Sequence, residues 1–192
     1  ASTNPATNFL GTTDNQAFEI RVDNAGTATE GRRRVMRFEP NATSANIIGG
    51  FNRNSVTSGV VGATIAGGGV NTLTNRMTDD YGVVSGGRDN RAGDNGGTTS
   101  NVPYATVSGG GSNTASNNGA TVGGGFNNTA SSVRSTVSGG DNNTASGDYA
   151  TMSGGYSNTA SGNSATVSGG VGNTAGGDYS AIAGGRSLIL NA

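Results

Sequence analysis

The chain has 192 residues, of which 36 are glycine and only 31% are hydrophobic, and its formal net charge is −1. So little large apolar side-chain volume cannot fill an ordinary three-dimensional core at protein packing density, although alanine, valine and isoleucine suffice for the narrow interior of a solenoid. Disorder, the other interpretation of a glycine-rich chain, normally brings a high net charge, which is absent here. The near-neutral charge also gives no general electrostatic reason to bind nucleic acid, and no run approaches the roughly 18 apolar residues of a membrane span.

Cysteine and histidine are both missing from the sequence. Disulfides, thiolate metal sites and the commonest general base and metal ligand are therefore ruled out. We expect a protein without enzyme activity that has no catalytic residues, no cofactor and no metal site.

Residues 1–44 contain two short segments of alternating polarity instead of a repeat. In residues 17–22 the apolar side chains of Phe18, Ile20 and Val22 share one face, and residues 34–38 form a second such segment. Turn formers occupy residues 23–31 between them. The pattern predicts a β-hairpin that caps a solenoid and covers its first coil with its apolar face.

The basic residues Arg32, Arg33, Arg34 and Arg37 cluster in this region. One interpretation is a binding patch for anionic glycans or nucleic acid. The other, which the charge balance favours, is a solvated hairpin edge neutralised by Glu19, Glu30 and Glu39.

Residues 45–186 are built from repeats. From residue 105 a unit recurs every 15 residues with the consensus A-T-V-S-G-G-x-x-N-T-A-S-G-x-Y, and related boxes begin at residues 45, 63 and 82, spaced by 18, 19 and 23. Each unit holds two short alternating stretches separated by glycine-rich turns. The sequence therefore predicts an all-β parallel β-roll, or β-solenoid, of about nine coils, with loops inserted after the first three.

Alternation assigns the side chains of each unit to the inside or the outside. The inward row comprises Val107, Val122, Val137, Met152, Val167 and Ile182. A possible surface threonine ladder comprises Thr106, Thr121, Thr136, Thr151 and Thr166, and a second row comprises Thr114, Thr129, Thr144, Thr159 and Thr174. The asparagine row predicts a structural hydrogen-bonded ladder and comprises Asn113, Asn128, Asn143, Asn158 and Asn173.

Few charged side chains occur in the regular repeats. Asp148 and Asp178 hold equivalent positions two coils apart and are interpreted as turn residues, not as a catalytic pair. The nine-residue period of calcium-binding β-rolls is missing, which argues against calcium. The regular threonine array has three interpretations: a sheet-stabilising ladder, a subunit interface, or an ice-binding surface.

The last segment, residues 187–192, contains Leu188, Ile189 and Leu190, the densest aliphatic run in the chain. An exposed apolar strand edge is a template for another chain. We expect self-association, as a filament or a trimer, in which these residues contact the apolar residues Phe9, Leu10 and Phe18 of a neighbouring copy.

The repeat A-T-V-S-G-G…N-T-A-S-G-x-Y resembles the head repeats of trimeric autotransporter adhesins of the YadA-like group and hemagglutinin-like repeat proteins of environmental bacteria. The resemblance covers about residues 45–185, and residues 9–22 and 34–41 resemble the leader of the hemagglutinin-like proteins. It implies a left-handed β-roll, usually a trimer, at the cell surface or outside the cell, that functions in adhesion. The period of 15 differs from the commoner 14. Residues 1–192 contain no coiled-coil stalk and no C-terminal membrane anchor. If they are the whole mature protein, we expect it to be secreted and to be held at the surface by assembly with other copies.

Three functions are consistent with this pattern. The first is a structural and adhesive fibre module, and the second is an ice-binding solenoid. The third is a head that binds host or environmental surface glycans through inserted residues 71–81 and 88–104. We expect no nucleic acid partner and no insertion into a membrane.

Overall fold

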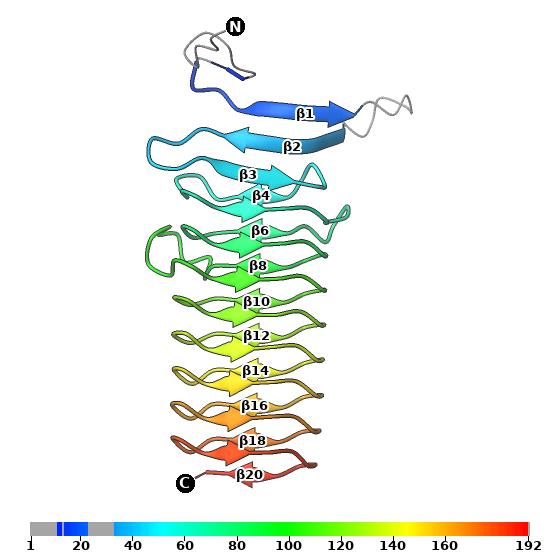
Figure 1. Cartoon of the computed structure of the whole chain (residues 1–192), viewed down its shortest axis with the longest axis vertical. Coiled ribbons are helices and arrows are strands. Elements are labelled where there is room, and N and C mark those ends of the chain that lie inside the picture. Colours follow the sequence, from blue (N-terminus) through cyan, green and yellow to red (C-terminus); the bar gives the residue numbers. More distant parts are fainter. Residues whose placement is uncertain (1–10, 13, 23–32, 192) are drawn as a thin grey trace, which may run out of the picture.

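The computed structural model describes residues 11, 12, 14–22 and 33–191, and all of their regular structure is β-strand (Figure 1). Parallel coils stack along one long axis, so the fold is a β-solenoid. Each coil gives one strand to sheet A and one to sheet B, and each sheet contains nine such strands. The described residues include no helix of the length and hydropathy that crossing a membrane requires.

The coil strands are two to four residues long, because glycine-rich turns interrupt them on both sides. Those of sheet A are β3 (Asn46–Gly49), β5 (Thr64–Ile65), β7 (Val83–Val84), β9 (Thr106–Val107), β11 (Thr121–Val122), β13 (Thr136–Val137), β15 (Thr151–Met152), β17 (Thr166–Val167) and β19 (Ala181–Ile182). Those of sheet B are β4 (Ser55–Val56), β6 (Arg76–Met77), β8 (Arg91–Ala92), β10 (Thr114–Ala115), β12 (Thr129–Ala130), β14 (Thr144–Ala145), β16 (Thr159–Ala160), β18 (Thr174–Ala175) and β20 (Ile189–Leu190).

Two further strands precede the first coil. β1 (Phe18–Val22) pairs antiparallel with β2 (Arg33–Glu39), and β2 pairs antiparallel with β3, so the hairpin extends sheet A edge to edge (Figure 1). The predicted cover of the first coil by the apolar face of β1 does not form, since Ile20 and Val22 remain 45% and 55% exposed. Backbone pairing with β3, not side-chain burial, joins the hairpin to the solenoid.

The interior is a column of small and branched apolar side chains. The predicted inward row is confirmed: its six members lie in register in sheet A, and all are at most 5% exposed. Facing it from sheet B is a row of buried alanines, Ala92, Ala115, Ala130, Ala145, Ala160 and Ala175. A further buried row, which includes Ala105, Ala120, Ala150 and Ala165, precedes the sheet A strands. These short rows fill the width of a coil, which is why this sequence needs no large core.

The first coil departs from the register that its box suggests. Aligning the boxes at residues 45 and 63 predicts an offset of 18, whereas Ile48 pairs with Ile65, an offset of 17. The offset returns to 18 in the following turn, where the Phe51 N–H donates to the Gly68 carbonyl. Ile48 thereby points inward in line with Ile65, so core packing decides the strand register and the turn absorbs the extra residue.

The longer insertions leave the solenoid at opposite edges (Figure 1). One lies between β5 and β6 and includes a small bridge between Val70 and Leu73. The other lies between β8 and β9. The segments 71–81 and 88–104, expected as loops, therefore include β6 and β8 of sheet B.

A column of buried asparagines runs along the turn before sheet B. The side-chain amide of Asn113 donates to the carbonyls of Gly109 and Gly125, at 2.8 and 3.0 Å, and its Oδ1 accepts from the Asn128 N–H at 2.9 Å. The same pattern repeats in the neighbouring coils, which confirms the predicted structural ladder. It requires close backbone approach: a Cβ on Gly125 would lie 2.1 Å from the Gly140 oxygen.

Candidate functional site

Exposed aromatic side chains gather where sheet B strands turn into the next sheet A strand. We call this side the tyrosine edge and define it by eight stacked residues, one per turn: Gly62, Tyr81, Tyr104, Gly119, Arg134, Tyr149, Ser164 and Tyr179. A continuous series of backbone hydrogen bonds keeps them in register, each N–H donating to a carbonyl of the preceding coil. The four tyrosines are 40–79% exposed.

The backbone of every tyrosine-edge residue has a positive φ. The tyrosines have φ of 56–68°, close to the 66° of Gly62 and the 63° of Gly119. Left-handed backbone costs a bulky residue about 1–2 kcal/mol relative to its usual conformation, and glycine avoids this cost. Tyrosine therefore occupies four positions where the backbone favours glycine and where its ring gains little burial.

Aspartate precedes three of the tyrosines, and in each case one carboxylate oxygen accepts a hydrogen bond from the backbone of the preceding coil. Oδ1 of Asp178 accepts from the Asn163 N–H at 2.8 Å, and Oδ1 of Asp80 accepts from the Val61 N–H at 2.9 Å. Asp148 makes the equivalent contact with the Val133 N–H at 3.2 Å. Asp148 and Asp178 are thus turn residues, as predicted, and each stands beside an exposed ring.

Neighbouring coils bring some of these side chains into contact. The rings of Tyr81 and Tyr104 stack with centroids 5.6 Å apart, and the guanidinium of Arg134 lies 5.8 Å from the centroid of the Tyr149 ring. The ring of Tyr179 is 79% exposed and is the most accessible. Sequence reasoning assigned no role to these tyrosines, although the tyrosine at the end of the repeat consensus was an available signal.

The two broad faces carry the threonine columns. Thr106, Thr121, Thr136, Thr151 and Thr166 pair in register on sheet A, and the second threonine row does so on sheet B. All ten side chains are half-buried, because each packs against its neighbours along the column. The ladders therefore contribute to sheet stability and also present rows of hydroxyls.

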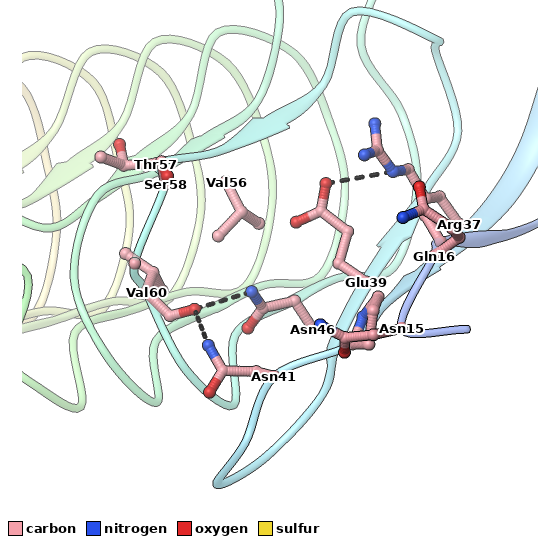
Figure 2. Close-up of a pocket in the computed structure, with 13 residues that line it drawn as sticks. Asn15, Gln16, Arg37, Glu39, Asn41, Asn46, Val56, Thr57, Ser58 and Val60 are labelled. Carbon is pink, nitrogen blue, oxygen red and sulfur yellow. Dashed lines mark hydrogen bonds and ion pairs between the residues drawn. The ribbon is translucent and has the colours of Figure 1, made fainter. Parts of the chain in front are cut away.

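A polar cavity of about 420 Å³ lies between the N-terminal segment and the first coil (Figure 2). Its lining includes Asn15, Gln16, Glu39 and Asn46, and the pictured side chains of Asn41 and Asn46 both donate to the Val60 carbonyl. These amides are already engaged with the backbone. The cavity is therefore a polar joint between the hairpin and the solenoid.

Two members of the basic cluster, Arg34 and Arg37, form ion pairs within the described residues. Arg37 contacts Glu39 at 3.1 Å, Arg34 approaches Glu19 at 4.0 Å, and Arg21 also pairs with Glu19. Arg34 is buried, donates to the Asn54 carbonyl at 3.0 Å, and has a pKa lowered by that burial. The expected neutralisation forms at Glu19 and Glu39, but Arg34 is buried and not solvated. Arg32, Glu30 and the side chain of Arg33 lie outside the described part of the chain.

The predicted assembly residues divide into three groups. Phe9 and Leu10 lie outside the described residues, and Phe18 stacks on Phe38 with ring centroids 6.0 Å apart. Leu188, Ile189 and Leu190 are 40–66% exposed. They do not share one face: Ile189 is in register with the outward Thr174, and Leu190 with the inward Ala175.

Asp79 anchors the insertion between β8 and β9. Its buried carboxylate accepts from the Thr78 hydroxyl and from the Asp94 N–H, both at 3.0 Å. Burial raises its pKa, and these hydrogen bonds oppose part of that rise. Asp79 thus fixes the inserted segment against the coil and makes no open site.

Comparisons with family models, with curated proteins and with solved structures gave no match to this chain.

Proposed function

We propose that this chain is a non-enzymatic extracellular structural and adhesive module, a rigid β-roll rod whose tyrosine edge is the adhesive surface. The observation that carries this proposal is the placement of tyrosine. All five tyrosines of the chain are at least 40% exposed, and four have the positive φ that the same column shows at Gly62 and Gly119, and also at Arg134 and Ser164. Strain of this kind persists where it serves function, and exposed tyrosine is a common anchor in recognition.

The rest of the rod supports the same proposal. Core, asparagine ladder and threonine columns repeat with little change, whereas the residues at the tyrosine edge vary from coil to coil. A uniform scaffold with varied edge residues is an arrangement for display. The resemblance of the repeat to adhesin head repeats adds to this support, and association of several rods in a fibre or trimer is part of the proposal.

Adhesion of beads coated with the whole chain tests the proposal. We expect the native chain to adhere to cell surfaces or glycan-coated surfaces, and the double variant Tyr149→Gly with Tyr179→Gly to lose most of that adhesion. The matched control is Asn142→Gly with Ser157→Gly, which changes two positive-φ residues at the opposite edge. Equal adhesion of both variants, or no adhesion of the native chain, would refute the proposed surface.

Ice binding is the second candidate, because the threonine columns give in-register hydroxyl rows on both faces. Thermal hysteresis and ice-crystal shaping by the native chain would support it. If the chain adheres to surfaces but does not affect ice growth, ice binding is rejected and only the adhesive function remains.

A further inference from the structure

Arginine replaces threonine on the outer face of sheet B in the second and third coils. Arg76 on β6 and Arg91 on β8 are direct partners in the parallel ladder, and the next outward residue is Thr114. Neighbouring strands lie about 4.8 Å apart, so both side chains extend from the same face of sheet B and both guanidinium groups can reach one anion. Like charges directly opposite each other destabilise a sheet, so the pair needs an explanation beyond folding.

Within the described residues, no carboxylate forms an ion pair with either arginine. The ion pairs found there involve Arg21, Arg34 and Arg37 of the hairpin. Arg76 is exposed and Arg91 is half-buried, with its Nε closed off from solvent. Because neither arginine is in an ion pair within the described residues, their positive charge is available to an external anion.

We infer that Arg76 and Arg91 form a binding site for a sulfate or carboxylate group of an anionic polysaccharide. A guanidinium donates through a planar fork that matches such oxyanions, and two forks one strand apart can hold the same group. Beyond Arg91, the threonine column of sheet B continues in line from Thr114 to Thr174. These hydroxyls line the path of the sugar chain along the face.

The charge around the pair favours a glycan over nucleic acid. Asp89 and Asp94 stand just before and after β8, and the whole chain has a net charge of −1. Nucleic acid binding depends on many phosphate contacts along an extended cationic surface. A site of two arginines between acidic residues suits an isolated acidic group on a largely neutral, hydroxyl-rich chain.

The site lies on a broad face and the tyrosine edge on a turn, so the inference goes beyond the proposed function and does not rest on it. Loss of adhesion in the tyrosine variants would leave this site intact. Loss of glycan binding in the arginine variants would leave the tyrosine edge intact.

Calorimetric titration of the whole chain with a sulfated heparin oligosaccharide tests the site. In the variant Arg76→Thr with Arg91→Thr, both positions receive the residue that five later coils use, so folding is expected to persist. Binding should weaken about tenfold or more, because two charge-assisted contacts are removed. Arg76→Thr alone changes an exposed position and should weaken binding by a smaller factor. This single variant tests the site if the double variant proves unstable.

The matched control for Arg76→Thr is Arg186→Val, which also removes one positive charge and introduces the residue that Val171 provides in the same column. Arg186 comes just before β20, six strands from β8 in sheet B, or about 29 Å away. The affinity of this control should stay within about twofold of the native value, because charges beyond a Debye length are screened. The inference would be overturned by absence of binding to the native chain, by an equal loss in the control, or by equally tight binding of a DNA duplex.

Discussion

The side-chain oxygen of Asn128 accepts a hydrogen bond of 2.9 Å from the backbone N–H of Asn143, one coil further along. Both side chains are completely buried, and each also bonds two glycine carbonyls. One side chain per coil thereby bonds three backbone groups, which belong to its own turn and to the next one. Stacked coils of only two short strands depend on this column for cooperativity.

Replacing Asn143 by alanine should lower the free energy of unfolding by about 3 kcal/mol or more. The carbonyl of Gly139 and the N–H of Asn158 would be left without partners, at about 1–3 kcal/mol each, and the Gly155 carbonyl would keep only the N–H of Asp141. The control is Asn163→Ala, an exposed position. Urea titration followed by circular dichroism measures both, and comparable losses would contradict the role of the ladder.

Val137→Asp should prevent folding or lower stability severely, because a carboxylate would enter a dry interior that has no partner for it. Val137 is fully buried between Val122 and Met152 in sheet A. Asp141→Asn, in a column that also holds glycine and valine, should be nearly neutral. Thermal melting compares the two variants, and similar melting shifts would mean that the inward row is not the stabilising core.

Asp79 should make stability fall as pH rises through its raised pKa. Burial raises that pKa in the folded chain, so between the ordinary and the raised value the folded state binds more protons than the unfolded state. Stability then decreases with increasing pH in that window. Asp79→Asn should remove this part of the dependence, whereas Asp178→Asn should not. Unfolding free energies measured at several pH values would contradict the prediction if the native and Asp79→Asn slopes agree.

Self-association should depend on the last described coil. Leu188 stands where the ladder otherwise has asparagine, since its N–H bonds Oδ1 of Asn173, and Ile189 stands where threonine is usual. The variant Leu188→Asn with Ile189→Thr restores the residues of the preceding coils and removes an exposed apolar edge. Light scattering should show less association than in the native chain. A native chain that stays monomeric at high concentration would contradict the prediction, and unchanged assembly in the variant would place the joint elsewhere.

The sequence by itself determined the all-β solenoid, the inward row from Val107 to Ile182 and the outward threonine rows. A period of 15 residues in alternating strands leaves one way to bring equivalent side chains into register, and the small residues leave no other core. Where the period holds, residues 15 apart in the sequence are direct neighbours in adjacent coils, so these rows could be predicted from the sequence.

Only the tertiary structure decided what happens where the period is broken or where backbone conformation matters. Insertions hide which residues face each other, so the pairing of Ile48 with Ile65 could not be read from the spacing of the boxes. Arg76 pairs with Arg91 at an offset of 15, although the boxes at residues 63 and 82 that precede them are 19 residues apart. The positive φ of Tyr149 and Tyr179 follows from the turn that joins stacked coils, not from a preference of tyrosine. Packing and backbone closure, which act between coils, fix these features, and the candidate surfaces follow from them.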